Sequence, residues 1–331
     1  MDKKKLLRIL LSELAADRLA ADIRGMLGPD EVEVVLARPV PGREPADIDI
    51  AYISRDVTGV STKQVLTESL EAFYASLRAS PRLQWVHTHS AGADRPIFPE
   101  LAARGVRVTT SSGANAGVVA QTALAGLLAL AREFPKLMRE QRKHAWTPLM
   151  SGALPRDLAG QKAVIVGWGP IARQIGASLQ LLGLEIAVAR HSAEPAGDNI
   201  RTVAYGGLHA VLPGADWLIL ACPLSDSTRR LIDRGAFESL PGGARLINVA
   251  RGEIVVESHL IEALQAGRLG GAYLDVFEYE PLSPDSPLWD IENVIVTPHS
   301  AGHSDGNAQR VDRMFLAYLK DWNDARAKVR R

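Results

Sequence analysis

Apolar and polar segments alternate along the chain in a way that predicts strands followed by helices. Short apolar runs, typical of strands buried on both faces, are separated by segments in which apolar residues repeat at helical spacing. Up to residue 112, helices are expected at 15–27 and 62–79, and Pro81 ends the second. This alternation predicts a parallel sheet covered by helices. The strands expected here lie at 7–11, 31–36, 48–53, 83–88 and 106–109.

The same alternation resumes further along the chain and predicts a second parallel sheet. Asn115 is a good cap for the Ala-rich helix expected at 116–132, and a last helix is expected at 306–326. The segment 134–158 is rich in Pro, Trp and charge without a clear period, so it is either an arm that packs on another subunit or a surface connection. Strands are expected at 163–166, 185–189, 217–221, 244–249, 271–276 and 294–297, and helices near 208–212, 234–240 and 258–266.

This order predicts an α/β fold of two doubly wound, Rossmann-like domains. We expect residues 1–115 plus 300–331 to form a discontinuous, flavodoxin-like substrate domain, because the last helix returns to the first domain. Residues 116–299 are expected to form an inserted NAD(P)-binding domain. Ligands of doubly wound sheets lie at the carboxyl ends of the strands, so the expected site is a cleft between the two domains.

Composition narrows the classes of function. Lys+Arg and Asp+Glu both number 38, and this zero net charge gives no indication of nucleic acid or an anionic membrane as a partner. The most apolar stretch, 116–131, is shorter than a membrane span. The single Cys222 excludes an intrachain disulfide and a thiolate metal cluster, and it suits a reducing cytosol. We therefore expect a cytoplasmic protein that holds no metal.

A glycine turn between the strand at 163–166 and the next helix predicts a dinucleotide site. Gly167 permits the tight turn, Gly169 lets the backbone approach a pyrophosphate, and Ala172 allows close packing of helix on strand. Such a triplet alone is more often an ordinary turn, but here a strand precedes it and a helix and second strand follow it. The N–H groups of the first helical turn would hold the phosphates. The cofactor-binding residues expected in this turn are Gly167, Trp168, Gly169, Pro170 and Ile171.

The end of the strand at 185–189 predicts NADP(H) in preference to NAD(H). An NAD site usually has Asp or Glu about 20 residues after the glycines to accept a hydrogen bond from the ribose 2′-hydroxyl. This chain has Arg190, His191 and Ser192 instead. An arginine cannot accept that hydrogen bond, but it can pair with a 2′-phosphate, and a nearby hydroxyl adds a donor. NAD remains the alternative cofactor.

Three polar residues follow consecutive strands of this second domain: Arg251, Glu280 and His299. Each alone is more often a solvated or structural residue, and the other seven histidines are assigned mostly to such roles. All three, however, are expected at the sheet edge where the nicotinamide would lie. A small-residue turn at 90–93 also leaves backbone N–H groups open, which suits a carboxylate ligand.

These residues stand in motifs that resemble a known family. The matching stretches are GWGPIA at 167–172, CPLSDST at 222–228, INVARGE at 247–253, LDVFEYEPL at 274–282 and PHSAG at 298–302. With looser matches at 90–94 and 111–121, the chain resembles the D-isomer-specific 2-hydroxyacid dehydrogenases, which include glyoxylate/hydroxypyruvate reductases and phosphoglycerate dehydrogenases. The resemblance implies a two-domain fold, usually a homodimer, with a small 2-oxo or 2-hydroxy acid as substrate.

The resemblance also implies a role for each residue. Arg251 would grip the carboxylate of the 2-oxo acid and polarise its keto oxygen. His299 would give a proton to the developing alkoxide as the hydride arrives, and Glu280 would fix the tautomer of His299 and favour its protonated form. Backbone donors to the substrate carboxylate would come from Ala91, Gly92 and Ala93. Further cofactor contacts would come from Cys222, Pro223, Thr228, Val249, Ala250, Asp275 and Gly302. Asp275 would hold the nicotinamide carboxamide or, alternatively, cap the end of its strand, and Cys222 is also explained by packing.

The sequence departs from the family pattern at Gln121-Thr122, where the family has an acidic and an aromatic residue. Glu280 argues against a formate dehydrogenase, in which glutamine partners the histidine. The function we expect is NAD(P)H-dependent reduction of a small 2-oxo acid, such as glyoxylate or hydroxypyruvate, to the D-2-hydroxy acid. Two alternatives stay open: a non-catalytic, nucleotide-sensing interaction protein on the same fold, and a dehydrogenase of a larger 2-oxo acid whose pocket Trp146 or Phe98 would shape.

Overall fold

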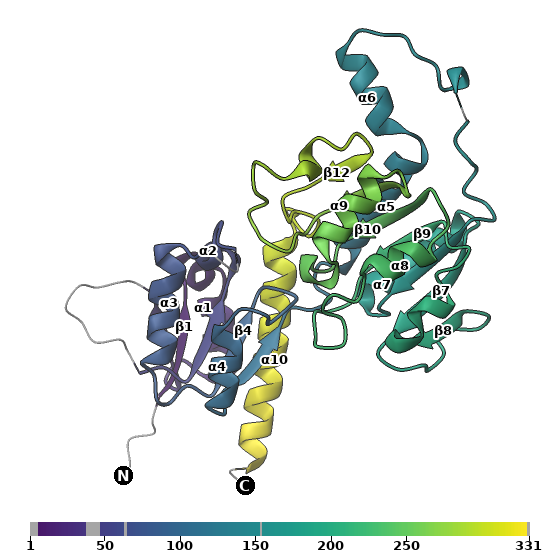
Figure 1. The fold of residues 1–331 in the computed structure, drawn as a ribbon. Helices are drawn as coiled ribbons and strands as arrows, with labels where there is room; N and C mark the ends of the chain where they lie inside the picture. The colour runs from purple at the N-terminus through teal and green to yellow at the C-terminus, as the bar shows by residue number, and fades with distance from the viewer. Residues whose placement is uncertain (1–5, 38–46, 63–64, 153, 330–331) are drawn as a thin grey trace. The chain divides into compact units, whose positions relative to one another are not determined.

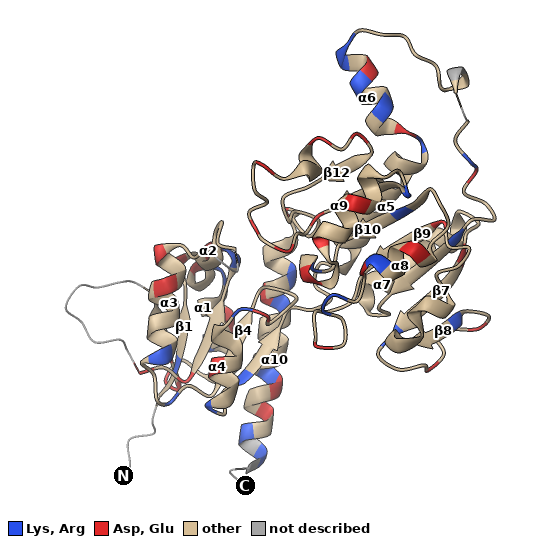
Figure 2. Ribbon diagram, in the orientation of Figure 1, with Lys and Arg blue, Asp and Glu red and all other residues tan. Residues whose placement is uncertain are grey.

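The structure, a computed structural model, describes residues 6–37, 47–62, 65–152 and 154–329. The chain divides into two compact units, of which the first is discontinuous in sequence. The first unit comprises Met1–Asn115 and Ser304–Arg331, and the second comprises Ala116–His303. Positions of Lys and Arg and of Asp and Glu occur in both units, for example along the helices Asn307–Val329 and Phe134–Arg142 (Figure 2).

The first unit is built on a five-stranded parallel sheet in the order β2-β1-β3-β4-β5 (Figure 1). Alternate strand residues face two separate cores, so that Ile9 packs beneath α1 and α10 while Leu10 packs with α3 and α4. The strands are β1 Leu7–Leu11, β2 Val32–Leu36, β3 Ile50–Ile53, β4 Trp85–Thr88 and β5 Arg107–Thr110, and the helices are α1 Glu13–Leu27, α2 Arg55–Thr58, α3 Glu68–Arg78, α4 Ile97–Ala103 and α10 Asn307–Val329.

The second unit contains a seven-stranded parallel sheet in the order β12-β11-β10-β9-β6-β7-β8. Its two faces are covered in the same alternating way: Ile165 and Ile219 pack with α5 and α7, whereas Val164 and Leu218 pack with α8 and α9. The strands are β6 Lys162–Val166, β7 Glu185–Arg190, β8 Arg201–Ala204, β9 Trp217–Leu220, β10 Ala244–Asn248, β11 Leu269–Leu274 and β12 Val294–Val296, and the α-helices are α5 Ala116–Ala131, α6 Phe134–Arg142, α7 Pro170–Leu181, α8 Arg234–Ser239 and α9 Glu257–Gln265.

The predicted α/β fold with parallel sheets is confirmed, and most predicted strands match to within two residues. Two elements, β8 and α6, were not predicted. β8 lies at the edge of the seven-stranded sheet, and its residues are mostly half-buried and form no apolar run. None of the residues of α6 is buried. The segment expected as a helix at 208–212 is instead a 3₁₀ turn, Tyr205–Ala210. The helix predicted at 62–79 begins at Glu68, and positions 63–64 lie outside the described residues.

The prediction that Asn115 caps α5 is wrong. Its Oδ1 atom is buried and has no hydrogen-bond partner among the residues that the structure describes. Helix α5 packs closely on the sheet at Gly126, where a Cβ atom would lie only 2.4 Å from the ring of Tyr273.

No single described helix has the length and apolar composition to span a membrane, although α5 and α6 together, bent by 70°, meet those two criteria.

The strand order reverses between β6 and β9, so this is the topological switch point of the seven-stranded sheet. Strands added after β6 run outward to β7 and β8 on one side, and strands from β9 onward run outward on the other. Loops leaving the carboxyl ends of β6 and β9 therefore diverge, and ligands of open α/β sheets bind where this divergence occurs. The glycine turn lies directly at this point.

Candidate functional site

The turn after β6 requires glycine at position 167. Gly167 has φ of +100°, and a Cβ atom there would lie 2.6 Å from the carbonyl oxygen of Ala221 and 2.8 Å from the Cα of Cys222. No other residue fits without moving the backbone at the end of β9. Gly167 thus brings the ends of β6 and β9 together where the sheet order diverges.

The first turn of α7 has room beside it for a ligand. Gly169 is the N-cap residue, Pro170 occupies the first turn, and a Cβ atom on Gly169 would have no atom within 4 Å. Ala172 is fully buried and seats the helix on the sheet. Open space next to the free N–H groups of a helix N-terminus suits a pyrophosphate, so these residues fit a bound dinucleotide.

The end of β7 and the loop after it contain the residues expected to determine selectivity between NAD and NADP. Arg190 is the last residue of the strand, with a quarter of its side chain exposed, and its Nη2 atom lies 3.8 Å from Oε2 of Glu194. His191 is exposed and Ser192 is half-buried. The cationic end of β7 is thus accessible, which is the condition for pairing with an anionic group of a ligand.

The strands that precede the three candidate catalytic residues are neighbours in the sheet. Asn248 of β10, Leu274 of β11 and Val296 of β12 lie at the same level in the register. Arg251 follows the first strand and His299 the third, while Glu280 follows the middle strand after a longer loop. The sheet therefore delivers all three residues to one edge.

At Gly252 the loop after β10 lies directly against the loop after β11, a contact that the sequence did not predict. A Cβ atom at this position would lie 1.8 Å from the carbonyl carbon of Phe277. Arg251 is therefore held against the segment that leads to Glu280. The Asn248 side chain holds this loop by accepting from the N–H of Ala250 at 3.0 Å and donating to the Arg251 carbonyl at 3.2 Å. The Arg251 Nη1 atom donates to the Ala250 carbonyl at 2.7 Å.

His299 and Glu280 form a hydrogen-bonded pair. The Nδ1 atom of His299 lies 2.8 Å from Oε2 of Glu280, and the other carboxylate oxygen, Oε1, accepts from the N–H of Phe277 at 3.2 Å. The Glu280 side chain is largely buried, whereas 48% of the His299 side chain is exposed. Because the carboxylate accepts from Nδ1–H, the Nε2 atom of the ring is left for a second partner.

The turn that carries His299 is held through its backbone by Asp275. The carboxylate of Asp275 accepts from the N–H groups of Ser300 at 2.8 Å and Ala301 at 3.0 Å, and from the Thr297 hydroxyl at 2.7 Å. Burial raises the pKa of this carboxyl, and these hydrogen bonds oppose that shift. His299 has φ of +51°, a conformation that the surrounding hydrogen bonds fix. These bonds match the alternative role expected for Asp275, a cap at a strand end.

Thr122, one of the two departures from the family pattern, also contacts this turn. Its hydroxyl lies 3.1 Å from the carbonyl oxygen of Ala301 and 3.0 Å from that of Val118 in its own helix. Gln121 is exposed. The threonine therefore links α5 to the His299 turn, a contact whose only sequence signal was the unusual residue pair.

Other predicted site residues have more varied surroundings. Thr228 is fully buried, and its hydroxyl is bonded within its own loop, to the Pro223 carbonyl at 2.8 Å and the Ser225 N–H at 2.7 Å. Cys222 is buried, and burial raises the pKa of its thiol to about 12. Val249 and Ala250 are buried in the loop start after β10, and Gly302 is half-buried.

The residues expected to contact substrate carboxylate belong to the first unit. Ala91, Gly92 and Ala93 follow β4, and the Ser90 hydroxyl donates to the Gly92 carbonyl at 2.8 Å, which shapes the turn. Of the two aromatic residues considered for a larger pocket, Phe98 is buried in the core of the first unit. Trp146 belongs to the second unit and is 96% exposed.

Comparison with known proteins gives consistent relatives. Residues 124–301 match the family model described as "D-isomer specific 2-hydroxyacid dehydrogenase, NAD binding domain". A glyoxylate reductase from Korarchaeum cryptofilum is 32% identical, over 77% of this chain and 77% of that protein. A hydroxyphenylpyruvate reductase from Plectranthus scutellarioides is 33% identical, over 67% of this chain and 69% of that protein.

A solved structure supports the same similarity over more of the chain. An NADPH-dependent glyoxylate/hydroxypyruvate reductase from Sinorhizobium meliloti, in complex with NADP and malonate, is 27% identical with a TM-score of 0.72. The match covers 96% of this chain and 94% of that one.

Proposed function

The chain belongs to the D-isomer specific 2-hydroxyacid dehydrogenase family, and we propose that it reduces a small 2-oxo acid, such as glyoxylate or hydroxypyruvate, to the D-2-hydroxy acid. The match to the family model confirms the resemblance expected from the sequence. Members of this family are oxidoreductases that use NAD(P). The observation that carries the proposal is the His299–Glu280 pair, in which Nδ1 of the histidine lies 2.8 Å from Oε2 of the carboxylate and Nε2 is left for a second partner.

The reduction adds a hydride to C2 of the acid and a proton to the oxygen on that carbon. The nicotinamide of the cofactor, when bound, would supply that hydride. His299 supplies the proton from Nε2, while Glu280 accepts from Nδ1–H and stabilises the imidazolium before transfer. In the oxidative direction the neutral ring takes the proton back. The Asp275 carboxylate keeps the turn fixed during both steps through its bonds to Ser300 and Ala301.

We propose substrate-binding residues in each unit, on the basis of contacts within that unit. The planar guanidinium of Arg251 pairs with the substrate carboxylate and polarises the keto oxygen, and the loop contacts at Asn248 and Gly252 support its position. In the first unit, we propose that backbone N–H groups of Ala91, Gly92 and Ala93 bind a substrate carboxylate. In this assignment residues 1–115 plus 300–331 act as the substrate domain and residues 116–299 as the cofactor domain.

The proposed cofactor is NADP(H), with NAD(H) as the alternative. Gly167, Trp168, Gly169, Pro170 and Ile171 would hold the pyrophosphate side, and Arg190, His191 and Ser192 the 2′-phosphate. The glycine positions support this because Gly169 leaves open space at the start of α7. Arg190 supports it because its accessible cation takes the place of an acidic acceptor.

The test is a panel of 2-oxo acids mixed with the protein and NADPH or NADH, followed through the loss of reduced nicotinamide absorbance. Glyoxylate and hydroxypyruvate should be consumed faster with NADPH, and Arg251→Ala should lower kcat/KM. Arg234→Ala, which removes an exposed arginine paired with Glu262 in the same unit, is the matched control. Cofactor binding without consumption of any acid would instead support the nucleotide-sensing alternative. Fast turnover of phenylpyruvate alone would support the larger-substrate alternative.

We also propose that the protein is a cytoplasmic homodimer, with α6 and the segment after it as the contact. The support is exposed apolar surface: none of the residues of α6, all of which the structure describes, is buried, and Trp146 and Met150 are 96% and 82% exposed. A second copy would remove such side chains from water. Light scattering should show a dimer, and Trp146→Asp with Met150→Asp should shift it to a monomer. The single cysteine supports the cytoplasmic location.

A further inference from the structure

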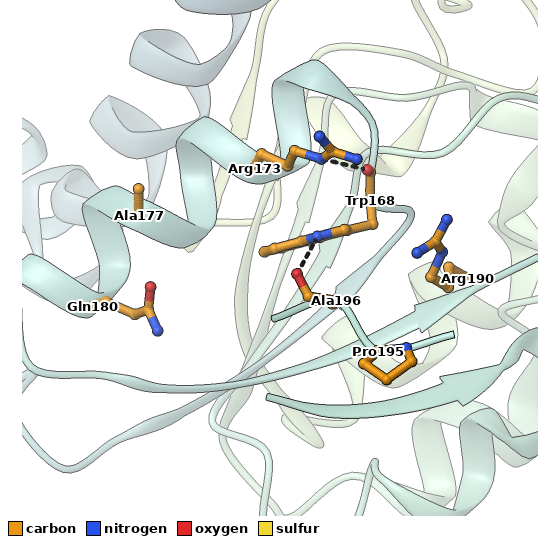
Figure 3. A pocket seen from close by; sticks show the side chains of 7 residues that line it. All are labelled: Trp168, Arg173, Ala177, Gln180, Arg190, Pro195 and Ala196. Carbon is orange, nitrogen blue, oxygen red and sulfur yellow. Dashed lines mark hydrogen bonds between the residues drawn. The ribbon is translucent and has the colours of Figure 1, made fainter. Parts of the chain in front are cut away.

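The second unit has a pocket of about 410 Å³ between α7, the end of β7 and the loop that follows β7 (Figure 3). Its walls include the indole of Trp168, two arginines and the loop that follows β7. The sequence predicted Trp168 only as a member of the glycine turn and did not single out Arg173. The residues that line the pocket and carry chemistry are Trp168, Arg173, Gln180, Arg190 and Ala196.

Trp168 fixes the loop wall of this pocket. Its Nε1–H donates to the Ala196 carbonyl at 2.9 Å, and the N–H of Ala196 donates to the Thr202 hydroxyl of β8 at 3.0 Å. The loop between β7 and β8 is therefore held on both sides of residue 196. The indole itself lies on Gly176 of α7, where a Cβ atom would come within 2.9 Å of the ring. A glycine on the helix is thus what admits the tryptophan.

Two guanidinium groups border the same pocket from different elements. Arg173 reaches it from α7, with its Nε–H donating to the Trp168 carbonyl at 3.2 Å, and Arg190 reaches it from β7. Figure 3 shows both groups near the backbone end of Trp168, with the indole extending away from them. The contact of Arg190 with Glu194 is long, at 3.8 Å, and Glu194 is 77% exposed, so this pair is weak.

We propose that this pocket is a site for the 2′-phosphate of NADP(H), in which Arg173 is a second cation beside Arg190 and Trp168 is a positioning residue. A phosphate monoester presents several oxygens at once, and two arginine forks can each donate to it. The inference rests on the proposed function in taking the dinucleotide as the ligand. It goes further in assigning the selectivity to a pair of arginines and to a tryptophan that holds the facing loop.

The experiment measures binding of adenosine 2′,5′-bisphosphate and of 5′-AMP to the cofactor-free protein by calorimetry. Arg173→Gln should weaken the bisphosphate by about ten- to hundredfold, the value of a lost charge-assisted hydrogen bond, and leave 5′-AMP nearly unchanged. Arg234→Gln is the matched control, since it removes one positive charge from the same unit at an exposed pair with Glu262. Equal weakening of both ligands, or of neither, would overturn the role of Arg173.

The role of Trp168 is tested with two variants. Trp168→Phe keeps an aromatic ring on Gly176 but loses the donor to Ala196, and it should weaken the bisphosphate by about two- to tenfold without affecting 5′-AMP. Gly176→Ala should displace the indole and reproduce that selective loss. Circular dichroism verifies that each variant is folded. Wild-type selectivity in both folded variants would overturn the positioning role.

These outcomes are independent of the proposed reaction, because neither ligand contains a nicotinamide and no 2-oxo acid is present. A protein that bound the bisphosphate through Arg173 but reduced no acid would contradict only the proposed function. A protein that reduced glyoxylate with the same NADPH-to-NADH preference before and after Arg173→Gln would contradict only this inference.

Discussion

The two units each place a histidine near the carboxyl end of a parallel strand, and the two residues have opposite surroundings. His87 of β4 is fully buried, and hydroxyl groups occupy both ring nitrogens: Thr109 at 2.8 Å from Nδ1 and Ser111 at 3.0 Å from Nε2. His299 follows β12, half of its side chain is exposed, and its Nδ1 faces a carboxylate. The two residues share their type and their position at a strand end, so neither property distinguishes a histidine with a structural role from one that transfers a proton.

The difference lies in what the neighbouring hydroxyl groups bind. Around His87 they bind the ring, and aromatic rings of Tyr52 and Phe315 lie beside it. Around His299 the hydroxyls of Thr297 and Thr122 bind the Asp275 carboxylate and the backbone of the turn instead. The turn is thereby rigid while one ring nitrogen stays accessible. A fixed backbone with an accessible ring is the arrangement that general acid catalysis needs.

Of the substitutions that test this comparison, His299→Ala is expected to have the largest effect. Loss of the proton donor should lower kcat by about 10²- to 10⁴-fold, the usual contribution of general acid–base catalysis. Affinity for NADPH should stay the same, because His299 acts on the proton and not on the nucleotide. Steady-state kinetics with glyoxylate and a fluorescence titration with NADPH check the two parts. Unchanged turnover would show that His299 is as structural as His87.

Glu280→Gln should have the next largest effect. The amide no longer stabilises the charged imidazole and can donate to Nδ1, which favours the wrong tautomer. Loss of a hydrogen bond to a charged group corresponds to about ten- to hundredfold in kcat. The readout is kcat with glyoxylate, compared with that of the unaltered chain under the same conditions. Glu278→Gln, a nearby half-buried carboxylate, serves as the control.

Much of this site was predictable from sequence, and the reason is its connection to the strands. Arg251, Glu280 and His299 follow apolar runs that form β10, β11 and β12, and neighbouring strands bring such residues to one edge. A capping role for Asp275 was one of the two expected from the sequence, but its particular partners and the contact of Gly252 with Phe277 depend on how the loops close and not on periodicity. β8 and α6 were missed for a related reason: neither buries a full apolar face.

His87 should contribute to an acid-dependent loss of stability in the first unit. Burial lowers its pKa to about 4 from an ordinary value of 6.5. Between those values the unfolded chain binds a proton that the folded unit does not, so stability falls as the pH falls from 6.5 towards 4. At pH 5 the loss from this group is roughly 2 kcal/mol relative to neutral pH. Hydrogen exchange of the β4 amides at pH 7 and pH 5 measures it.

The matched variant for that measurement is His87→Asn, which removes the titrating group. It should be less stable at pH 7, because the ring no longer fills its place among the aromatic side chains. Its further decline between pH 7 and pH 5 should nevertheless be smaller than that of the unaltered chain. Equal declines would mean that His87 is not protonated differently in the folded and unfolded states, and the contrast with His299 would lose its basis.

The smallest expected effect comes from Thr122→Val, which tests whether the turn of His299 is held from α5. Valine keeps the shape of threonine and removes only the donor to the Ala301 carbonyl, so about 1 kcal/mol of support for the turn is lost. Because Asp275 still holds the N–H groups of Ser300 and Ala301, kcat should fall by only about two- to fivefold. Thr297→Val removes a bond to the Asp275 carboxylate itself and should cost more. If Thr122→Val were the more damaging of the two, the helix, and not the buried carboxylate, would be what fixes the proton donor.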